Sequence, residues 1–256
     1  MKLNIVPARI GLTWVRLGIS TFFRQPLALA GLFSLYAGAM WLLARIPVLG
    51  AAVSTILVPA ATLGMMVATQ QAAGGKFPMP TVLLSAFRIG RERANAMLLL
   101  GLLYAAGWFA AISVAGLIWP LPATQQANTA AGQGQLAMFY LVVSLFTLPL
   151  SMLFWHAPAL VHWHGVGPVK SLFFSLVACL RNGGALLVFG LAWSAVSVGV
   201  VAATTLVAVA IGGPSMVGHI FYPLLTLLTA MFLTSIYFSF RDSFVADEAP
   251  TPGESP

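Results

Sequence analysis

The 256-residue chain is 60% hydrophobic and only 7% charged, and its mean hydropathy is +0.96. A water-soluble domain of this size carries about a quarter of its residues charged, so this composition excludes an ordinary soluble fold. The formal net charge of +7 comes from basic residues that stand singly and form no run typical of a nucleic-acid-binding arm, so we expect no nucleic-acid partner.

Long uncharged intervals indicate several membrane spans. No acidic or basic residue occurs in 46–75, 94–169 or 182–240. A helix needs about 20 apolar residues to cross a bilayer, so each of the last two intervals has room for two spans. The sequence therefore predicts an all-α polytopic membrane protein with six transmembrane helices, at about 27–44, 46–69, 96–118, 136–160, 184–211 and 217–240.

The connections predict which ends share a side of the membrane. Residues 45–47 are expected to form the first turn, residues 120–135 a polar loop rich in Pro and Gly, and residues 212–219 the last external turn. Of the twelve Lys and Arg residues, all except Arg45 fall on one side of this topology. The positive-inside rule assigns that side to the cytoplasm, which makes both termini cytoplasmic.

A basic segment with helical periodicity precedes each odd-numbered span. Its polar or small residues recur at steps of three and four, which places them on one stripe of a helix. The stripes are Arg9, Thr13, Arg16, Ser20 and Arg24; then Thr81, Ser85, Arg88, Glu92 and Asn95; then Ser171, Ser175, Ala178 and Asn182. We expect three interfacial helices that lie in the inner leaflet and bind anionic lipid through basic residues. The candidates are Arg9, Arg16, Arg24, Arg88, Arg91, Arg93, Lys170 and Arg181.

This pattern predicts three copies of one unit, each with an interfacial helix, a span, an external turn and a second span. The copies run approximately over 1–78, 79–167 and 168–244, within one transmembrane domain of residues 1–244. Basic amphipathic segments flank the spans of many membrane proteins. The alternative to a true repeat is therefore that these three segments share only this general feature. Residues 245–256 are acidic and rich in proline, and we expect them to form a disordered cytoplasmic tail.

Three of the four histidines lie in "FWHAPALVHWHG", residues 154–165. His156 and His162 are about 240° apart on a helix, and His162 and His164 about 200°, so neither pair faces one metal ion. We therefore expect no metal or haem and no other cofactor. The preferred interpretation is the water-facing end of the fourth span, with Trp155 and Trp163 in the interfacial belt. Two alternatives stay open: a functional polar cluster of His156, His162, His164, Gln70 and Arg241, or a metal site completed by residues from elsewhere.

Several stretches resemble an uncharacterised proteobacterial inner-membrane protein family. They are "IVPARIGLTWVRLGISTFFRQPLALAGL", "PAATLGMMVATQ", "LSMLFWHAPALVHWHGVGPVKSLFFSLVACLRN" and "TSIYFSFRDSF". The resemblance covers nearly the whole chain except the loop near 120–135 and the tail. It implies a bacterial inner-membrane location and carries no activity or catalytic residue.

The predicted spans contain few residues that could take part in catalysis or ion coupling. None contains Asp, Glu, Lys or Arg in its interior, which argues against an ion-coupled relay. Motifs of nucleotide-binding, metal-dependent and serine-hydrolase enzymes are absent. We expect a non-enzymatic protein that organises the membrane by binding lipids or a protein partner. A transporter or channel for a small solute is the alternative, and an intramembrane hydrolase that uses histidine and serine is a more distant one.

Overall fold

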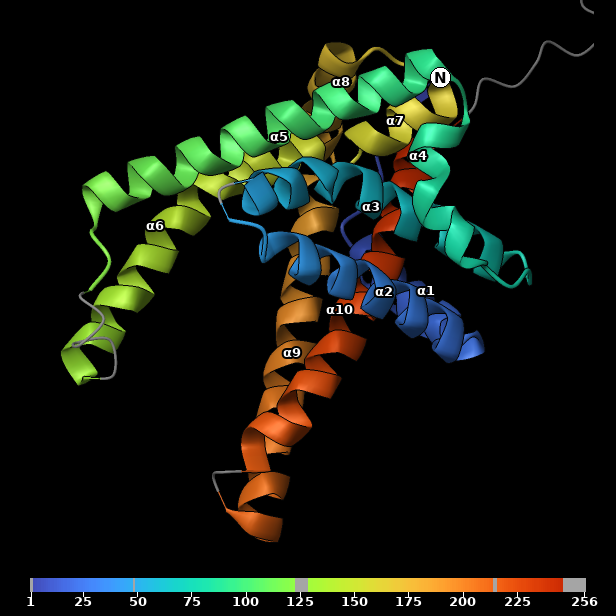
Figure 1. The fold of residues 1–256 in the computed structure, drawn as a ribbon. Helices are drawn as coiled ribbons and strands as arrows, with labels where there is room; N and C mark the ends of the chain where they lie inside the picture. Colours follow the sequence, from blue (N-terminus) through green and yellow to red (C-terminus); the bar gives the residue numbers. More distant parts are fainter. Residues whose placement is uncertain (1, 48, 123–128, 214–215, 246–256) are drawn as a thin grey trace, which may run out of the picture. The chain divides into compact units, whose positions relative to one another are not determined.

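A computed structural model describes residues 2–47, 49–122, 129–213 and 216–245, and these are almost entirely helical (Figure 1). Within the described residues, six helical segments are long and apolar enough to cross a membrane, so the predicted all-α fold with six spans is confirmed. They are α2 (Pro26–Ala44), α3 (Leu49–Ala73), α5 (Arg91–Ile118), α6 (Ala130–Phe154) followed by α7 (Ala157–His164), α9 (Gly183–Gly212) and α10 (Met216–Ser243).

Shorter elements precede the odd-numbered spans and join the two chain ends. These are β1 (Lys2–Leu3), α1 (Ile10–Arg24), the 3-10 helix η1 (Pro80–Leu84), α4 (Ser85–Arg88), α8 (Pro168–Arg181) and β2 (Phe244–Val245). The expected helices of the first and third segments are present as α1 and α8. The threefold repeat, as a relation between three-dimensional copies, stays a prediction.

The second amphipathic segment is not one helix, and that part of the prediction is wrong. A 3-10 turn and the single turn of α4 end before Gly90, whose φ is +117°. This conformation is strained for residues with a Cβ and stops a helix. Arg88 therefore precedes the break, whereas Arg91 and Glu92 begin the next span.

The turns agree with the sequence where the structure describes them. α2 ends at Ala44 and residues 45–47 turn before α3, as predicted. The polar loop is shorter than expected because α6 begins at Ala130, capped by the Thr129 hydroxyl. Residues 123–128, 214–215 and 246–256, which include most of the predicted tail, lie outside the described residues.

The chain divides into two compact units. The first contains Met1–Ala39, Ala61–Ser85 and Val177–Pro256, and the second contains Met40–Ala60 and Ala86–Leu176. Each is described by itself below.

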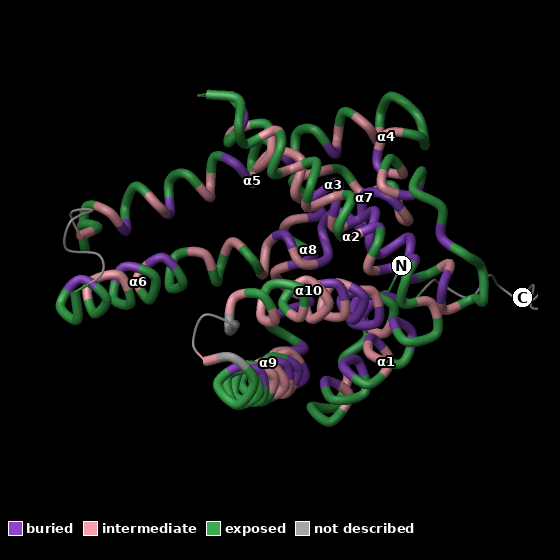
Figure 2. The backbone as a smooth tube through the Cα atoms, turned by 60° about the horizontal axis from the view of Figure 1, so that its bottom comes forward, coloured by how far each residue is buried: buried purple, intermediate pink, exposed green. Residues whose placement is uncertain are grey.

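In the first unit, α1 packs against α9 and α10. Its buried face carries Gly11, Trp14, Gly18 and Phe22, and buried and exposed positions alternate along the helix in Figure 2. A Cβ added at Gly11 would collide with the backbone of α9, and one added at Gly18 would collide with Ser235 of α10. Glycine at these two positions lets the helix backbones approach closely, as small residues do in membrane helix packing.

Hydrogen bonds tie both ends of the described chain to the same unit. β1 pairs antiparallel with β2, with Lys2 opposite Val245. The Asn182 amide accepts from the Val6 N–H at 2.9 Å and donates to the Asn4 carbonyl at 3.1 Å. Because the strands pair directly, the two chain ends lie on the same side of this unit.

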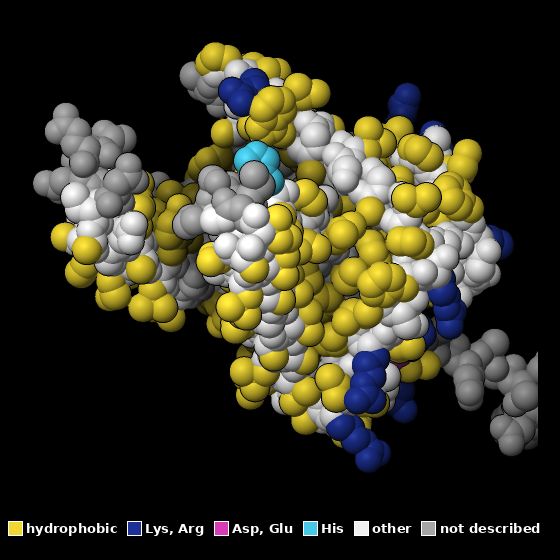
Figure 3. Space-filling view, turned by 90° about the horizontal axis from the view of Figure 1, so that it is seen from below, with side chains coloured by type: hydrophobic (Ala, Val, Ile, Leu, Met, Phe, Trp, Pro, Cys, Tyr) yellow, Lys and Arg dark blue, Asp and Glu magenta, His cyan; other side chains and the backbone are white. Residues whose placement is uncertain are grey.

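Large apolar side chains on the long helices point outward. Leu27 is 88% exposed and Leu117 is 85% exposed. On the face seen in Figure 3, hydrophobic side chains are spread widely, and Lys and Arg gather in only a few places. An exposed apolar surface of this extent is expected where acyl chains replace water as the solvent.

The close approach of α1 to α10 gives a test of this packing. Replacing Gly18 with Ala should lower the melting temperature in detergent by several degrees, because the added methyl overpacks a tight interface at a cost of about 1–3 kcal/mol. Gly31→Ala is the matched control, since a Cβ at Gly31 in α2 meets no atom within 4 Å. Equal melting temperatures for the two variants, measured by differential scanning fluorimetry, would contradict the described docking of α1.

Candidate functional site

The fourth span is interrupted in the second unit by a side chain from another helix. α6 ends at Phe154 and α7 begins at Ala157. In a continuous helix, the His156 N–H would donate to the Met152 carbonyl four residues earlier. Here the Ser175 hydroxyl stands between them: it accepts from the His156 N–H at 2.9 Å and donates to the Met152 carbonyl at 2.8 Å. Insertion of a side chain into the backbone ladder is a recognised cause of a helix kink.

Pro158 fits this interruption. It lies in the first turn of α7, where its missing N–H leaves no helical bond unmade. The break lies at Trp155 and His156, before Pro158, and α7 runs without interruption from Ala157 to His164, so Pro158 does not separate His156 from His162 by a second break.

The three histidines have different surroundings. His156 is 1% exposed and His162 is 9% exposed, whereas His164 is half-buried. The water-facing position expected for the whole stretch therefore does not hold for His156 and His162, which are both buried. The segment that follows the break is packed inside the protein, since residues 156–162 are all buried.

The end of α7 is held by backbone and arginine contacts. Gly165 takes a left-handed conformation with φ of +63°, and the Val166 N–H donates back to the Leu160 carbonyl at 3.3 Å. Arg93 of α5 donates from Nη1 to the His162 carbonyl at 2.9 Å. A cation at the carbonyl end of a helix is favoured by the helix dipole.

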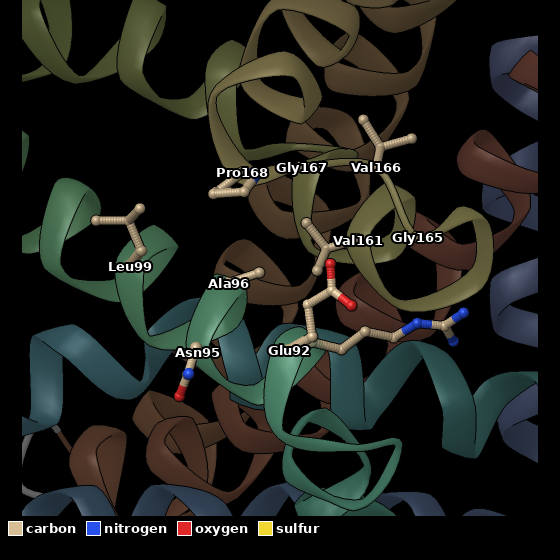
Figure 4. A pocket seen from close by; sticks show the side chains of 10 residues that line it. Glu92, Asn95, Ala96, Leu99, Val161, Gly165, Val166, Gly167 and Pro168 are labelled. Carbon is tan, nitrogen blue, oxygen red and sulfur yellow. The ribbon is translucent and has the colours of Figure 1, made fainter.

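A pocket of about 390 Å³ lies beside this arginine in the second unit (Figure 4). One wall is the start of α5 and the other is the end of α7 with the loop into α8. Figure 4 shows the Glu92 side chain directed toward Val161 across the pocket. The lining residues are Glu92, Arg93, Asn95, Ala96, Leu99, Val161, Gly165, Val166, Gly167 and Pro168.

The remaining members of the predicted polar cluster belong to the first unit. Gln70 forms a side-chain hydrogen bond with Tyr237. Arg241 pairs with Asp242 at 2.8 Å, and Asp242 also accepts from the Trp14 indole N–H at 2.9 Å. The histidines belong to the second unit, so a cluster that joins all five residues stays a prediction.

The stripe predicted on α8 faces inward. Ser171, Ser175, Ala178 and Asn182 are all buried, and Phe173 on the same helix is 61% exposed. The basic residues expected to bind lipid from this segment, Lys170 and Arg181, are exposed, whereas the stripe itself is packed against protein. Its hydroxyl and amide groups bond to the backbone of the protein instead.

Among the described residues, no group of three or more His, Cys, Asp or Glu side chains is arranged to hold a metal ion. The absence of a cofactor stays a prediction.

Comparison with known proteins supplies the family. The chain is 35% identical to a protein of Burkholderia thailandensis named a probable inner membrane protein, across 98% of this chain and 97% of the relative. The chain belongs to this inner-membrane protein family. No protein-family model matches it, and no solved structure matches it.

In this inner-membrane protein, most of the predicted lipid-binding residues are exposed. Arg93 is the exception, because it is half-buried and bonded to α7. Sequence periodicity grouped Arg93 with the surface arginines and gave no sign of its contact with α7. The exposed residues are Arg9, Arg16, Arg24, Arg88, Arg91, Lys170 and Arg181.

Ser175→Ala tests whether the hydroxyl holds the interruption of the fourth span. The variant removes the hydroxyl that bonds to the His156 N–H and to the Met152 carbonyl, so unfolding should become easier by about 1–3 kcal/mol. Exchange of the His156 amide hydrogen should also become faster. Ser171→Ala is the matched control, since Ser171 is equally buried in the same helix but its hydroxyl donates to the nearby Pro168 carbonyl. Unchanged exchange at His156 together with equal stability of the two variants would show that the hydroxyl is dispensable.

Proposed function

We propose that this protein is a non-enzymatic organiser of the inner membrane that binds anionic lipid through the arginines of α1. One observation carries the proposal. α1 buries one face against α9 and α10, while Arg16 and Arg24 on the helix and Arg9 at its N-cap are exposed away from that face.

The packing of α1 supports lipid binding because it fixes the arginines in advance. Trp14 is fully buried and its indole N–H donates to Asp242, so the helix is anchored in its register. A guanidinium group can donate two parallel hydrogen bonds to a phosphate. Each basic residue near an anionic surface contributes about 1 kcal/mol of attraction. Three on one ordered helix are therefore enough to concentrate anionic lipid.

The proposed orientation puts this helix at the cytoplasmic face. Both termini are assigned there by the distribution of Lys and Arg, and the pairing of β1 with β2 is consistent with termini on one side. The inner leaflet would then supply the phosphates.

A transporter or channel is the alternative. A groove of about 630 Å³ between α9 and α10, in the first unit, is the feature that would support transport. Ser194, Ser197 and Thr229 contribute hydroxyl groups, but apolar residues form most of the lining, and none of the described lining residues is charged. A hydrophilic solute would find few partners there, so the groove supports transport less well than the α1 arginines support lipid binding.

Topology can be tested by thiol labelling. The single natural cysteine, Cys179, is buried, and Cys179→Ala provides a background without thiols. Ala131→Cys, exposed at the start of α6, should react with an impermeant maleimide added to intact cells. Lys76→Cys, exposed after α3, should react only after the cells are broken. The reverse pattern would invert the proposed orientation.

Lipid binding by α1 can be tested with a triple variant. Replacing Arg9, Arg16 and Arg24 with Gln should reduce bound phosphatidylglycerol several-fold, because about 3 kcal/mol of attraction is removed and only part of it acts on any one lipid. Native mass spectrometry of the detergent-purified protein measures the bound lipid. The matched control replaces the same residues with Lys, which keeps the charge. If the Gln variant retains as much phosphatidylglycerol as the Lys variant, the proposal fails.

A further inference from the structure

The pocket at the start of α5 has features that the proposed role of α1 does not use. It lies within the second unit, where the charged first turn of α5 passes into its apolar run. α5 packs against α7 here, so the wall opposite is the end of another membrane-spanning segment. Both walls therefore mark the level at which the protein enters the membrane.

One acid and one base line this pocket side by side. Two carboxylates belong to the described residues, Glu92 and Asp242. Asp242 is held by Arg241 and Trp14, whereas no arginine in the described part of the chain forms an ion pair with Glu92. Glu92 is exposed in the pocket wall, so its carboxylate is accessible to a cationic group.

Arg93 is fixed in the same wall. Its Nη1 donates to the His162 carbonyl, and Nη2 lies beside Gly165, where an added Cβ would be 3.6 Å away. A guanidinium has five N–H donors, so this contact leaves others for an anion. Burial and the bond to α7 make Arg93 a positioned cation, in contrast to the exposed Arg91.

Apart from Asn95, the remaining lining residues are apolar or glycine. Ala96 and Leu99 follow Glu92 along α5, and Val161 faces them from α7. A ligand that fits this pocket therefore needs a cation and an anion on one end and an apolar part next to them. A free solute with two charges would leave the apolar wall unused.

The geometry points to a binding site for the headgroup of phosphatidylethanolamine. Its ammonium group would donate to Glu92, its phosphate would accept from Arg93, and its glycerol and upper acyl carbons would lie against Leu99 and Val161. Glu92 discriminates among lipids, because it repels a headgroup that is only anionic and finds no N–H donor on the methylated amine of phosphatidylcholine. The site shares no residue with the arginines of α1 and does not depend on their role.

The test compares three lipids on the full-length protein. Detergent-purified protein is exposed to mixed micelles with equal amounts of phosphatidylethanolamine, phosphatidylcholine and phosphatidylglycerol, and bound lipid is measured by native mass spectrometry. The natural chain should prefer phosphatidylethanolamine to phosphatidylcholine. Glu92→Gln should weaken phosphatidylethanolamine binding about tenfold, as expected for one charge-assisted hydrogen bond, and should leave phosphatidylcholine unchanged.

Arg91→Gln is the matched control, since Arg91 is exposed in the same turn and does not line the pocket. It should leave phosphatidylethanolamine binding unchanged. Equal binding of phosphatidylethanolamine and phosphatidylcholine to the natural chain would overturn the inference, and that comparison needs no variant. Free phosphoethanolamine that binds as tightly as the lipid would overturn it too, because the apolar wall would then contribute nothing. Failure of the α1 triple variant to change phosphatidylglycerol binding would count against the proposed function alone.

Discussion

The structure depends on one constraint: in an apolar solvent, every backbone N–H and C=O group needs a partner within the protein. A continuous helix meets that requirement by itself, but this chain departs from helices at several points. At the break before α7, the Ser175 hydroxyl supplies both an acceptor and a donor to the two groups that the kink separates. Outside the spans, near the pairing of β1 with β2, the Asn182 amide also bonds to the backbone of Val6 and Asn4. At the end of α7, Arg93 donates a hydrogen bond to the His162 carbonyl.

This constraint explains why the stripe of α8 is turned inward. In water, an amphipathic helix buries its apolar face and exposes its polar one. In a bilayer, small hydroxyl and amide side chains gain more from bonding to the backbone of a neighbouring segment, and phenylalanine can face the acyl chains at little cost. Ser171 and Ser175 are buried while Phe173 is exposed, which is the inverse of the soluble pattern. α1 differs because its stripe carries guanidinium groups, which are too strongly hydrated to be buried without partners.

The sequence predicted the fold class and the six spans because both follow from composition. Uncharged length determines where helices can cross, and the span limits agree with the structure to within about six residues. Local conformation was harder to predict. Gly90 breaks the second amphipathic segment through its positive φ, and the steps of three and four continue through it without interruption. Periodicity also cannot show which side of a stripe is packed: it placed Ser175 and Asn182 on one stripe but gave no sign that both are buried.

The candidate site was predictable only in part, because its contacts join residues far apart in the sequence. His162 and Arg93 are 69 positions apart, and no local pattern links a histidine carbonyl with an arginine side chain. From the sequence alone, all the basic residues were assigned the same two roles, which are to set the topology and to attract lipid. The structure divides them into two. Arg93 and Arg241 bond to groups of the protein, and Arg45 lies 4.3 Å from the centre of the Trp41 ring. Arg9, Arg16 and Arg24 project from a helix whose other face is packed. A neutral substitution in the first group removes a structural contact as well as a charge, whereas one in the second removes mainly charge. Measurements on the exposed group can therefore separate the effect of charge from the effect of lost packing.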